Sequence, residues 1–346
     1  MPNNLLHRFK LAGRILLKGQ LPPRPRRDVP AITPEEVAEA KSFFPLEKFF
    51  IYGHARSGTT LLTRLVRLHP GVHCNYQAHF FTRQPLLESL VADEEIGSWL
   101  SRRSNRWNRG GDLSPLVLRA AADFILERDA RRAGKGAPGC IVGDKSPNSL
   151  LDGDAVRQMV KVYPDARLVF IVRDGRDAAL SHRFQAFIDR PQHLNAEDLR
   201  IREAFIHDAS PFLAGQRSVF TEKGLRGAAQ GWVHNVVDTD QVARALLGER
   251  YCSLRYEDLL TSPWEAMSRL WGFLGADPTA PGLKEALDAE LIQNPDADWQ
   301  AEKASDIASA LTKGKRGTWR ELFTPRDRQV FQEIAGETLS AWGYEA

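Results

Sequence analysis

The 346-residue sequence predicts an α/β fold of three layers, in which a central parallel sheet carries helices on both faces. Three observations favour this class. Short apolar runs alternate with segments of helical periodicity, and the connections between them are short. The run 167–172 is continuously apolar, as expected of a parallel strand that is buried on both faces. The length allows one large domain or two small ones, and we expect one.

The first expected strand, residues 49–52, leads into the loop that organises the rest of the chain. Gly53 and Gly58 enclose four residues, which is the spacing of the phosphate loop of nucleoside-triphosphate enzymes. The N–H groups of Ser57 to Thr60 would begin the next helix, expected over 60–68, without intrahelical acceptors, and the helix dipole there favours an anion. We therefore predict a phosphate-loop-like nucleotide-binding fold.

This loop departs from that motif after its second glycine. The motif requires Lys and then Ser or Thr, whereas this chain has Thr59 and Thr60, and Arg56 is the only cation of the loop. An arginine fork can bind a phosphate or sulfate at two points. The sequence therefore predicts an anion site without the lysine that reaches the β- and γ-phosphates. The alternative is that Arg56 only ties its loop to a neighbouring helix.

Further elements follow from hydrophobic periodicity and turn residues. Apolar runs predict strands at residues 72–76, 140–143, 167–172 and 251–255. Helical patterns predict helices within 86–132, with a surface loop at 102–112, and at 154–163, after Asp177, at 231–247, 262–274 and 325–342. Residues 184–226 have weak periodicity with several prolines and glycines, and we expect an insertion over one face that acts as a lid.

Three loops that carry cations follow strands of the expected sheet. Arg56 follows the first strand, Lys145 the third and Arg173 the fourth. Ligands of parallel α/β sheets lie at the carboxyl ends of the strands, so we expect these cations at one site. Ser181, eight residues beyond Arg173, adds a hydroxyl donor if the loop folds back beside the helix. A later cluster, Lys313-Gly314-Lys315-Arg316-Gly317, suits a loop around a phosphate.

Together these motifs resemble the sulfotransferases that use 3′-phosphoadenosine-5′-phosphosulfate. Residues 55–61 are similar to the 5′-phosphosulfate loop of that family, and the pair Arg173 and Ser181 to its 3′-phosphate element. The segments 145–147, 255–257 and 313–317 are similar to further segments of the protein-tyrosine branch and its bacterial relatives. The resemblance extends over about residues 48–342 in matching order.

The resemblance implies a set of site residues. The catalytic cations would be Arg56 and Lys145, at the sulfuryl group in flight. The residues implied to bind the donor are Arg56, Ser57, Gly58, Thr59, Thr60, Arg173, Ser181, Tyr256, Lys313, Lys315, Arg316 and Gly317. An aromatic residue such as Tyr256 is more often part of the core than a nucleotide contact. The resemblance implies no metal ion, which agrees with the absence of the phosphate-loop lysine.

The general base is where this chain departs from the branch. The protein-tyrosine branch has a Glu 21 residues after the loop arginine, where this chain has Gln77, which cannot take a proton. His79 is the nearest residue that can, and His54 and Asp144 are further candidates. A structural role is the alternative for each. The departure makes a peptide tyrosine a doubtful acceptor.

The N-terminal segment differs from the rest in charge. Residues 1–27 hold seven basic residues and no acidic one, and Leu5 and Phe9 begin an amphipathic pattern with helical spacing. Packing on the domain is one interpretation, and peripheral contact of residues 5–27 with an anionic membrane is the other. We expect this helix and a proline-rich connector over 1–32, and a single sulfotransferase domain over 33–346 with its insertion at about 184–226.

Composition limits the partners and the compartment. A net charge of +3 is too balanced to favour nucleic acid, and no apolar run of about 18 residues predicts a membrane-spanning helix. The three cysteines lack metal or disulfide spacing and favour a reduced, cytoplasmic protein, with membrane contact, if any, at the inner face. A small molecule, a glycan or a lipid is the expected acceptor. The sequence does not predict an oligomeric state.

Two other functions fit part of the pattern. A phosphate-loop kinase or nucleotidase would use Asp174 as its metal-binding strand end, but the missing lysine argues against it. A catalytically inactive binding member of the same fold gains weight from Gln77.

Overall fold

The computed structural model describes residues 28–82, 87–148, 150, 152–292 and 317–345. Its centre is a parallel sheet of five strands in the order β2-β3-β1-β4-β5. The strands are β1 (Glu47–Gly53), β2 (Val72–Tyr76), β3 (Ile141–Lys145), β4 (Arg167–Val172) and β5 (Tyr251–Arg255). The parallel sheet confirms the predicted fold class, and the expected bounds of β2, β4 and β5 are confirmed to the residue.

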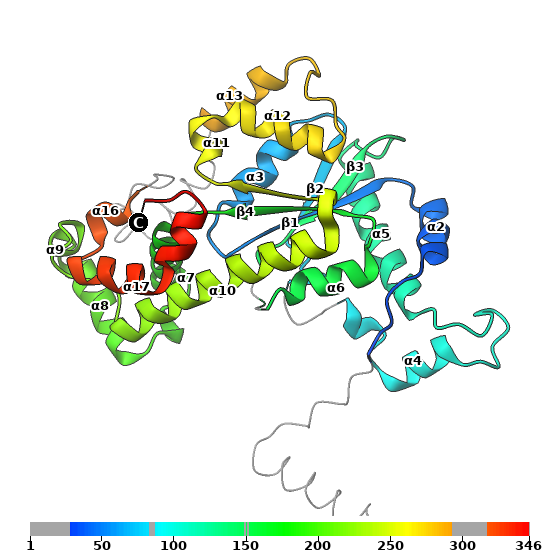
Figure 1. Ribbon diagram of the computed structural model, residues 1–346, viewed down its shortest axis with the longest axis horizontal. Helices are drawn as coiled ribbons and strands as arrows, with labels where there is room; N and C mark the ends of the chain where they lie inside the picture. The colour runs from blue at the N-terminus through cyan, green and yellow to red at the C-terminus, as the bar shows by residue number, and fades with distance from the viewer. Residues whose placement is uncertain (1–27, 83–86, 149, 151, 293–316, 346) are drawn as a thin grey trace, which may run out of the picture.

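The helices cover both faces of this sheet (Figure 1). One face carries α3 (Thr59–Val66), α11 (Asp258–Thr261), α12 (Pro263–Leu274) and α13 (Leu283–Ile292). The other carries α5 (Ser114–Arg132), α6 (Asp154–Val162) and α10 (Glu222–Leu247), and α17 (Pro325–Ala341) packs against α10. The remaining described elements are α2 (Pro34–Phe43), η1 (Glu88–Leu90), α4 (Glu94–Ser101), α7 (Gly175–Asp189), η2 (Pro191–His193), α8 (Ala196–His207), α9 (Ser210–Leu213), η3 (Gly248–Arg250) and α16 (Trp319–Leu322).

Alternation along β1 divides the core into two parts. Phe49 and Ile51 pack with α3 and α12, whereas Phe50 and Tyr52 pack on the opposite face with α5 and α6. All four side chains are nearly or fully buried, because a strand at the centre of a covered sheet has no solvent-facing side. The burial explains why this stretch is apolar at every position.

The register of the three central strands brings their ends to one edge. Ile51 of β1 pairs with Lys145 of β3 on one side and with Val169 of β4 on the other. The chain leaves β1 at Gly53 and β4 at Val172, so the loops after β3, β1 and β4 are neighbours. The expected meeting of these three loops is confirmed.

Three helix assignments from the sequence were wrong in part. Helix α10 begins at Glu222, nine residues before the expected start, with Thr221 as its N-cap. Helix α7 begins at Gly175, inside the expected loop, because the Asp174 carboxylate caps it. Helix α13 was not expected. The range 184–226 expected as an insertion includes the end of α7 and the start of α10, with η2, α8 and α9 between them. Phe205 of α8 packs on Phe184 of α7, and the role of this range as a lid stays a prediction.

The first described residues, 28–32, pack against the rest of the domain. Val29 and Ile32 are buried, and the Ile32 N–H donates to the Lys161 carbonyl oxygen at 2.8 Å. Thr33 caps α2 in a reciprocal capping box with Glu36. The expected amphipathic helix before it lies outside the described residues. Within the described residues, no helix is both long and apolar enough to cross a bilayer.

Candidate active site

The loop after β1 is shaped by two glycines that no other residue could replace without displacement. A Cβ on Gly53 would lie 2.8 Å from the Ile171 carbonyl oxygen, and one on Gly58 would lie 2.1 Å from the Tyr256 ring. Gly58 also has a φ of +85° and is the N-cap of α3, with no side-chain cap. The first N–H groups of α3 are therefore presented to this edge of the sheet, where an anion would bind.

Arg56 links this loop to α7. Its Nε donates a hydrogen bond to Ser181 Oγ at 3.0 Å, and its backbone is left-handed with a φ of +71°. Arg173 Nη1 donates in turn to the Arg56 carbonyl oxygen at 3.2 Å. The structure thus brings Arg56, Arg173 and Ser181 together, and it is Arg56 rather than Arg173 whose side chain bonds to Ser181.

Tyr256 packs against both the β1 loop, at Gly58, and the β4 loop, at Arg173. The ring is 6 % exposed, lies under Gly58, and has the Arg173 guanidinium carbon 4.8 Å from its centroid. Burial raises the pKa of the Tyr256 hydroxyl, although Arg173 opposes the shift. The residue is thus a packed aromatic that contacts the loop, which matches its more common structural role.

The late basic loop ends beside the start of α7. Lys313, Lys315 and Arg316 lie outside the described residues, but the N–H of Gly317 donates to Asp177 Oδ2 at 2.6 Å. The N–H of Trp319 donates to the other oxygen of Asp177 at 3.1 Å. The Asp177 carboxylate therefore anchors this part of the chain close to Arg173. Burial raises the pKa of Asp177, although the positive charge of Arg173 opposes the shift.

Asp177 was not predicted from the sequence. It follows the β4 loop as an ordinary acidic residue of a helix first turn, and nothing in the sequence pairs it with a segment 140 residues away. Arg176 lies in the same first turn of α7. Arg176 in fact bonds to Asp174 and places its guanidinium carbon 3.7 Å from the Trp319 ring centroid, so it serves the same anchor.

Lys145 enters the site from β3. The residue is fully buried, and its Nζ donates to Thr60 Oγ1, in the first turn of α3, at 3.3 Å. The same Nζ lies 5.1 Å from the centroid of the Tyr76 ring. The lysine thus lies near the N-terminal end of α3, as the adjacent strands predict.

The segment after β2 lies against Lys145. The Gln77 N–H donates to the Lys145 carbonyl oxygen at 2.6 Å, and both Gln77 and His79 have left-handed backbones, with φ of +56° and +52°. His79 is buried, and its Nδ1 is 2.8 Å from Thr82 Oγ1. Gln77 and His79 are therefore close to Lys145, just after β2, the strand on the far side of β3 from β1.

The other two candidates for the base have different surroundings. Burial lowers the pKa of His54 to about 4, and the nearby His182 adds to the shift, so the ring is neutral and weakly basic at neutral pH. Burial raises the pKa of Asp144 to about 6, although hydrogen bonds from Ser146 and Ala78 oppose the shift. Within the described residues, no cluster of three or more His, Cys, Asp or Glu side chains could hold a metal ion.

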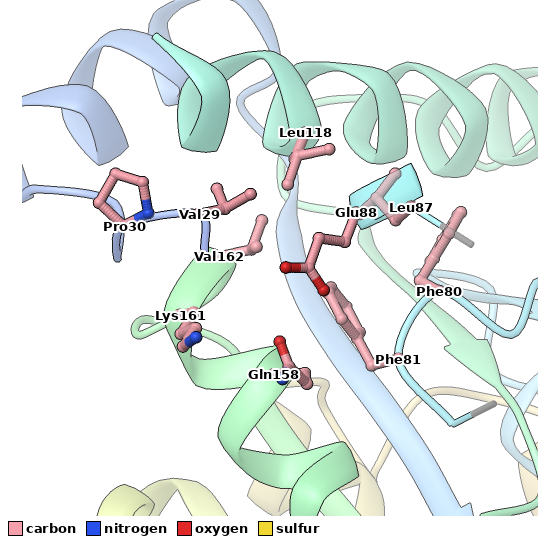
Figure 2. Close-up of a pocket in the computed structure, with 10 residues that line it drawn as sticks. All are labelled: Val29, Pro30, Phe80, Phe81, Leu87, Glu88, Leu118, Gln158, Lys161 and Val162. Atoms are coloured by element: carbon pink, nitrogen blue, oxygen red, sulfur yellow. The ribbon is translucent and has the colours of Figure 1, made fainter. Parts of the chain in front are cut away.

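Two cavities lie near these elements. The first, of about 20 Å³, is a crevice behind Phe80 and Phe81 with room for about one water molecule, and Figure 2 shows the Glu88 carboxylate reaching into it. It is too small for a substrate. The second is open, about 400 Å³ in volume, and is lined by Asp177 and Gly317 among others, next to the anchor of the late loop.

This arrangement defines a class of protein: an α/β protein with basic side chains gathered at the carboxyl ends of three adjacent parallel strands. A profile of the sulfotransferase family matches residues 48–280. The chain therefore belongs to the sulfotransferase family.

Individual relatives agree with this assignment. A protein-tyrosine sulfotransferase of Drosophila melanogaster is 27 % identical over 225 residues, which are 65 % of this chain and 37 % of that protein. Protein-tyrosine sulfotransferase 1 of Danio rerio is 28 % identical over 127 residues, which are 37 % of this chain and 32 % of the relative. The chain thus matches about a third of the length of these curated relatives.

Solved structures give similar, more distant matches. The crystal structure of mouse sulfotransferase SULT7A1 complexed with PAP has a TM-score of 0.45 at 17 % identity and covers 88 % of this chain and 89 % of its own. A sulfotransferase domain from the curacin biosynthetic pathway has a TM-score of 0.45 at 18 % identity, over 87 % of this chain and 98 % of its own.

Proposed function

We propose that the protein transfers a sulfuryl group from 3′-phosphoadenosine-5′-phosphosulfate to a hydroxyl or amine of an acceptor. The observation that carries the proposal is the convergence of Arg56, Lys145 and Arg173 from the ends of three adjacent strands. Family membership supports it. The mouse neighbour crystallised with PAP, the desulfated form of this donor, is consistent with it.

The donor would span the β1 and β4 loops. In this proposal the segment Arg56 to Thr60, with its left-handed Gly58, receives the 5′-phosphosulfate at the start of α3. Arg173, Ser181 and the loop 313–317 receive the 3′-phosphate. The anchor of Gly317 on Asp177 supports this assignment, because it brings the end of that loop to the helix that carries Ser181.

Transfer requires charge stabilisation on both sides of the sulfur. The acceptor oxygen forms the new S–O bond while the bond from sulfur to the 5′-phosphate oxygen breaks, and adenosine 3′,5′-bisphosphate leaves. Arg56 and Lys145 are the cations that would stabilise the equatorial oxygens and the leaving phosphate. Lys145 is suited to this because its buried ammonium group is held by Thr60 of α3.

The acceptor proton needs a base, and we assign it to His79. Gln77 cannot take a proton, and the lowered pKa of His54 makes that ring a weaker base. His79 lies on the segment that contacts Lys145, and its ring is fixed by Thr82. We infer a small molecule, a glycan or a lipid as the acceptor, since the branch that sulfates peptide tyrosine has a Glu at the position of Gln77.

The location of the protein is part of the same proposal. Three cysteines that form no disulfide support a cytoplasmic protein: Cys74 is buried, and Cys140 and Cys252 are partly buried. The basic composition of residues 5–27 supports a peripheral contact with an anionic membrane. The division at residue 33 into a terminal segment and one catalytic domain, with a lid over 184–226, completes the proposal.

The experiment is incubation of the purified full chain with radiolabelled phosphosulfate donor and a host-cell metabolite extract. We expect label in a sulfated product that mass spectrometry identifies. Parallel samples receive Mg²⁺ and labelled ATP. Metal-dependent ATP turnover without sulfuryl transfer would replace the proposal with the kinase or nucleotidase. Binding of adenosine 3′,5′-bisphosphate with neither reaction would favour an inactive binding member.

A further inference from the structure

Three consecutive N–H groups after β2 are bound by three consecutive residues at the end of β3. Gln77 donates to the Lys145 carbonyl oxygen at 2.6 Å. Ala78 donates to Asp144 Oδ1 at 3.0 Å, and His79 donates to Ser146 Oγ at 2.9 Å. The two segments are therefore joined residue by residue just beyond the point where β2 and β3 stop pairing at Tyr76 and Lys145.

The segment 77–79 is held in a conformation that side chains disfavour. Two of its three residues, Gln77 and His79, have φ near +55° although neither is glycine. Such residues cost free energy and persist only where the surroundings determine the backbone. On the far side, Phe81 fixes the chain by packing edge-on against Phe50, with ring centroids 5.6 Å apart. Between these ends, the three hydrogen bonds hold the N–H groups of the left-handed residues in place.

Asp144 is the centre of this connection. It is 1 % exposed, its Oδ1 accepts from Ala78, and its Oδ2 accepts from the Ser146 hydroxyl at 2.6 Å. Ser146 Oγ in turn accepts from His79. Each carboxylate oxygen is thus used in holding the backbone, so the group is arranged as a structural acceptor rather than as a base that meets the substrate.

We propose that Asp144 is a positioning residue for the acceptor side of the site: with Ser146 it fixes Gln77 to His79 beside Lys145. The inference rests on the proposed function, because it gives the fixed segment the task of orienting the base and the acceptor hydroxyl. This role divides the site into a donor side and an acceptor side. The donor loops belong to β1 and β4, whereas this connection belongs to β2 and β3.

Hydrogen–deuterium exchange tests the connection without any substrate. In Asp144→Ala and in Ser146→Ala we expect the amides of the peptide around residues 77–82 to exchange at least about tenfold faster. Peptides around Arg56 and Arg173 should keep their protection. Asp144→Asn retains a carbonyl acceptor for Ala78 and should restore most of the protection. Unchanged exchange at 77–82 in both alanine variants would overturn the proposal.

A matched control shows whether a lost carboxylate acts only locally. Asp277 also accepts one backbone N–H and one hydroxyl, both from Thr279, but on an exposed turn after α12. Asp277→Ala should change neither exchange at 77–82 nor transfer. Ser146→Ala keeps the test valid if Asp144→Ala does not fold, because it removes the His79 bond while the Asp144 carboxylate keeps its hydrogen bond from Ala78.

Kinetics then distinguish positioning from a general structural role. With the acceptor identified by the labelled-donor experiment, Asp144→Ala should lower kcat at least about tenfold. Its affinity for adenosine 3′,5′-bisphosphate, measured by calorimetry, should stay within about twofold, and Asp144→Asn should recover most of the rate. Equal losses of donor affinity and rate would overturn the positioning role. If exchange changes as expected but the wild type transfers no sulfuryl group, the proposed function fails and the role with it, while the connection itself stands.

Discussion

Arg56 Nε donates a hydrogen bond to Ser181 Oγ at 3.0 Å, across the gap between the β1 loop and α7. Arg173 bonds to the carbonyl oxygen of the same arginine. The two segments proposed for the two ends of the donor are therefore in contact through Arg56. A ligand that binds to the β1 loop or to α7 meets side chains that the other segment already orients. This lowers the entropic cost of ordering those side chains on binding.

Arg173→Ala should weaken binding of adenosine 3′,5′-bisphosphate. Loss of a charge-assisted phosphate contact of about 1.5–3 kcal/mol corresponds to about a 10- to 150-fold weaker affinity. Titration calorimetry measures this directly. The control is Arg190→Ala, at the exposed C-cap of α7, the helix that Arg173 precedes. This variant should bind the ligand as the wild type does. Equal affinities for wild type and Arg173→Ala would remove this arginine from the donor site.

Asp177→Ala should lower the affinity for adenosine 3′,5′-bisphosphate by about tenfold, although the negative charge of Asp177 does not favour contact with a phosphate. The reason is its hold on the N–H groups of Gly317 and Trp319, which ends the late basic loop beside α7. Asp177→Asn can keep one of these bonds, so its affinity should lie between those of the wild type and Asp177→Ala. If removal of the negative charge instead strengthened binding in both variants, Asp177 would be only a repulsive neighbour of Arg173.

Gly58→Ala should destabilise the fold more than the same change at another left-handed glycine. A Cβ at Gly58 meets the Tyr256 ring at 2.1 Å, whereas one at Gly110, whose φ is +79°, meets nothing within 4 Å. Backbone strain is thus common to both variants, and overpacking of about 1–3 kcal/mol is added only at Gly58. Urea denaturation compares them. Similar losses at the two positions would show that Tyr256 moves aside at little cost.

Asp144→Asn should change how stability depends on pH. Burial raises the folded pKa of Asp144 from 3.8 to about 6, so the native state binds more protons than the unfolded state between these values. Stability from this group is therefore present at low pH and is lost as pH rises through about 6, by up to about 3 kcal/mol. Urea unfolding of the asparagine variant should lack that loss. Parallel curves for both proteins would contradict the raised pKa.

At neutral pH the buried Asp144 carboxylate is disfavoured relative to its protonated form, which favours a functional reason for its presence at the end of β3. The positioning of residues 77–79 supplies one.

The parts of this account that the sequence predicted are those set by local pattern. Strands β2, β4 and β5 are bounded to the residue because apolar runs and turn residues coincide there. The start of α10 was missed because Gly224, Gly227 and Gly231 lower the helix propensity of a stretch that tertiary packing nevertheless keeps helical.

The site was predictable to the extent that it depends on strand ends. Arg56 and Arg173 follow β1 and β4, and Lys145 is the last residue of the neighbouring β3. The topology rule alone brings them to one edge of the sheet. Asp177 and Asp144 were not assigned their roles, because both act on backbone N–H groups of distant segments. A backbone donor leaves no mark on the residue types of the segment that supplies it.

The central claim is that Arg56 and its loop serve sulfuryl transfer. The most direct measurement compares the rate at which label passes from radiolabelled phosphosulfate donor to the identified acceptor in the wild type, Arg56→Lys and Arg56→Ala. We expect transfer by the wild type, loss of at least about 100-fold in Arg56→Ala with an unchanged unfolding curve, and a partial loss in Arg56→Lys. Transfer at the wild-type rate by a folded Arg56→Ala variant would contradict it.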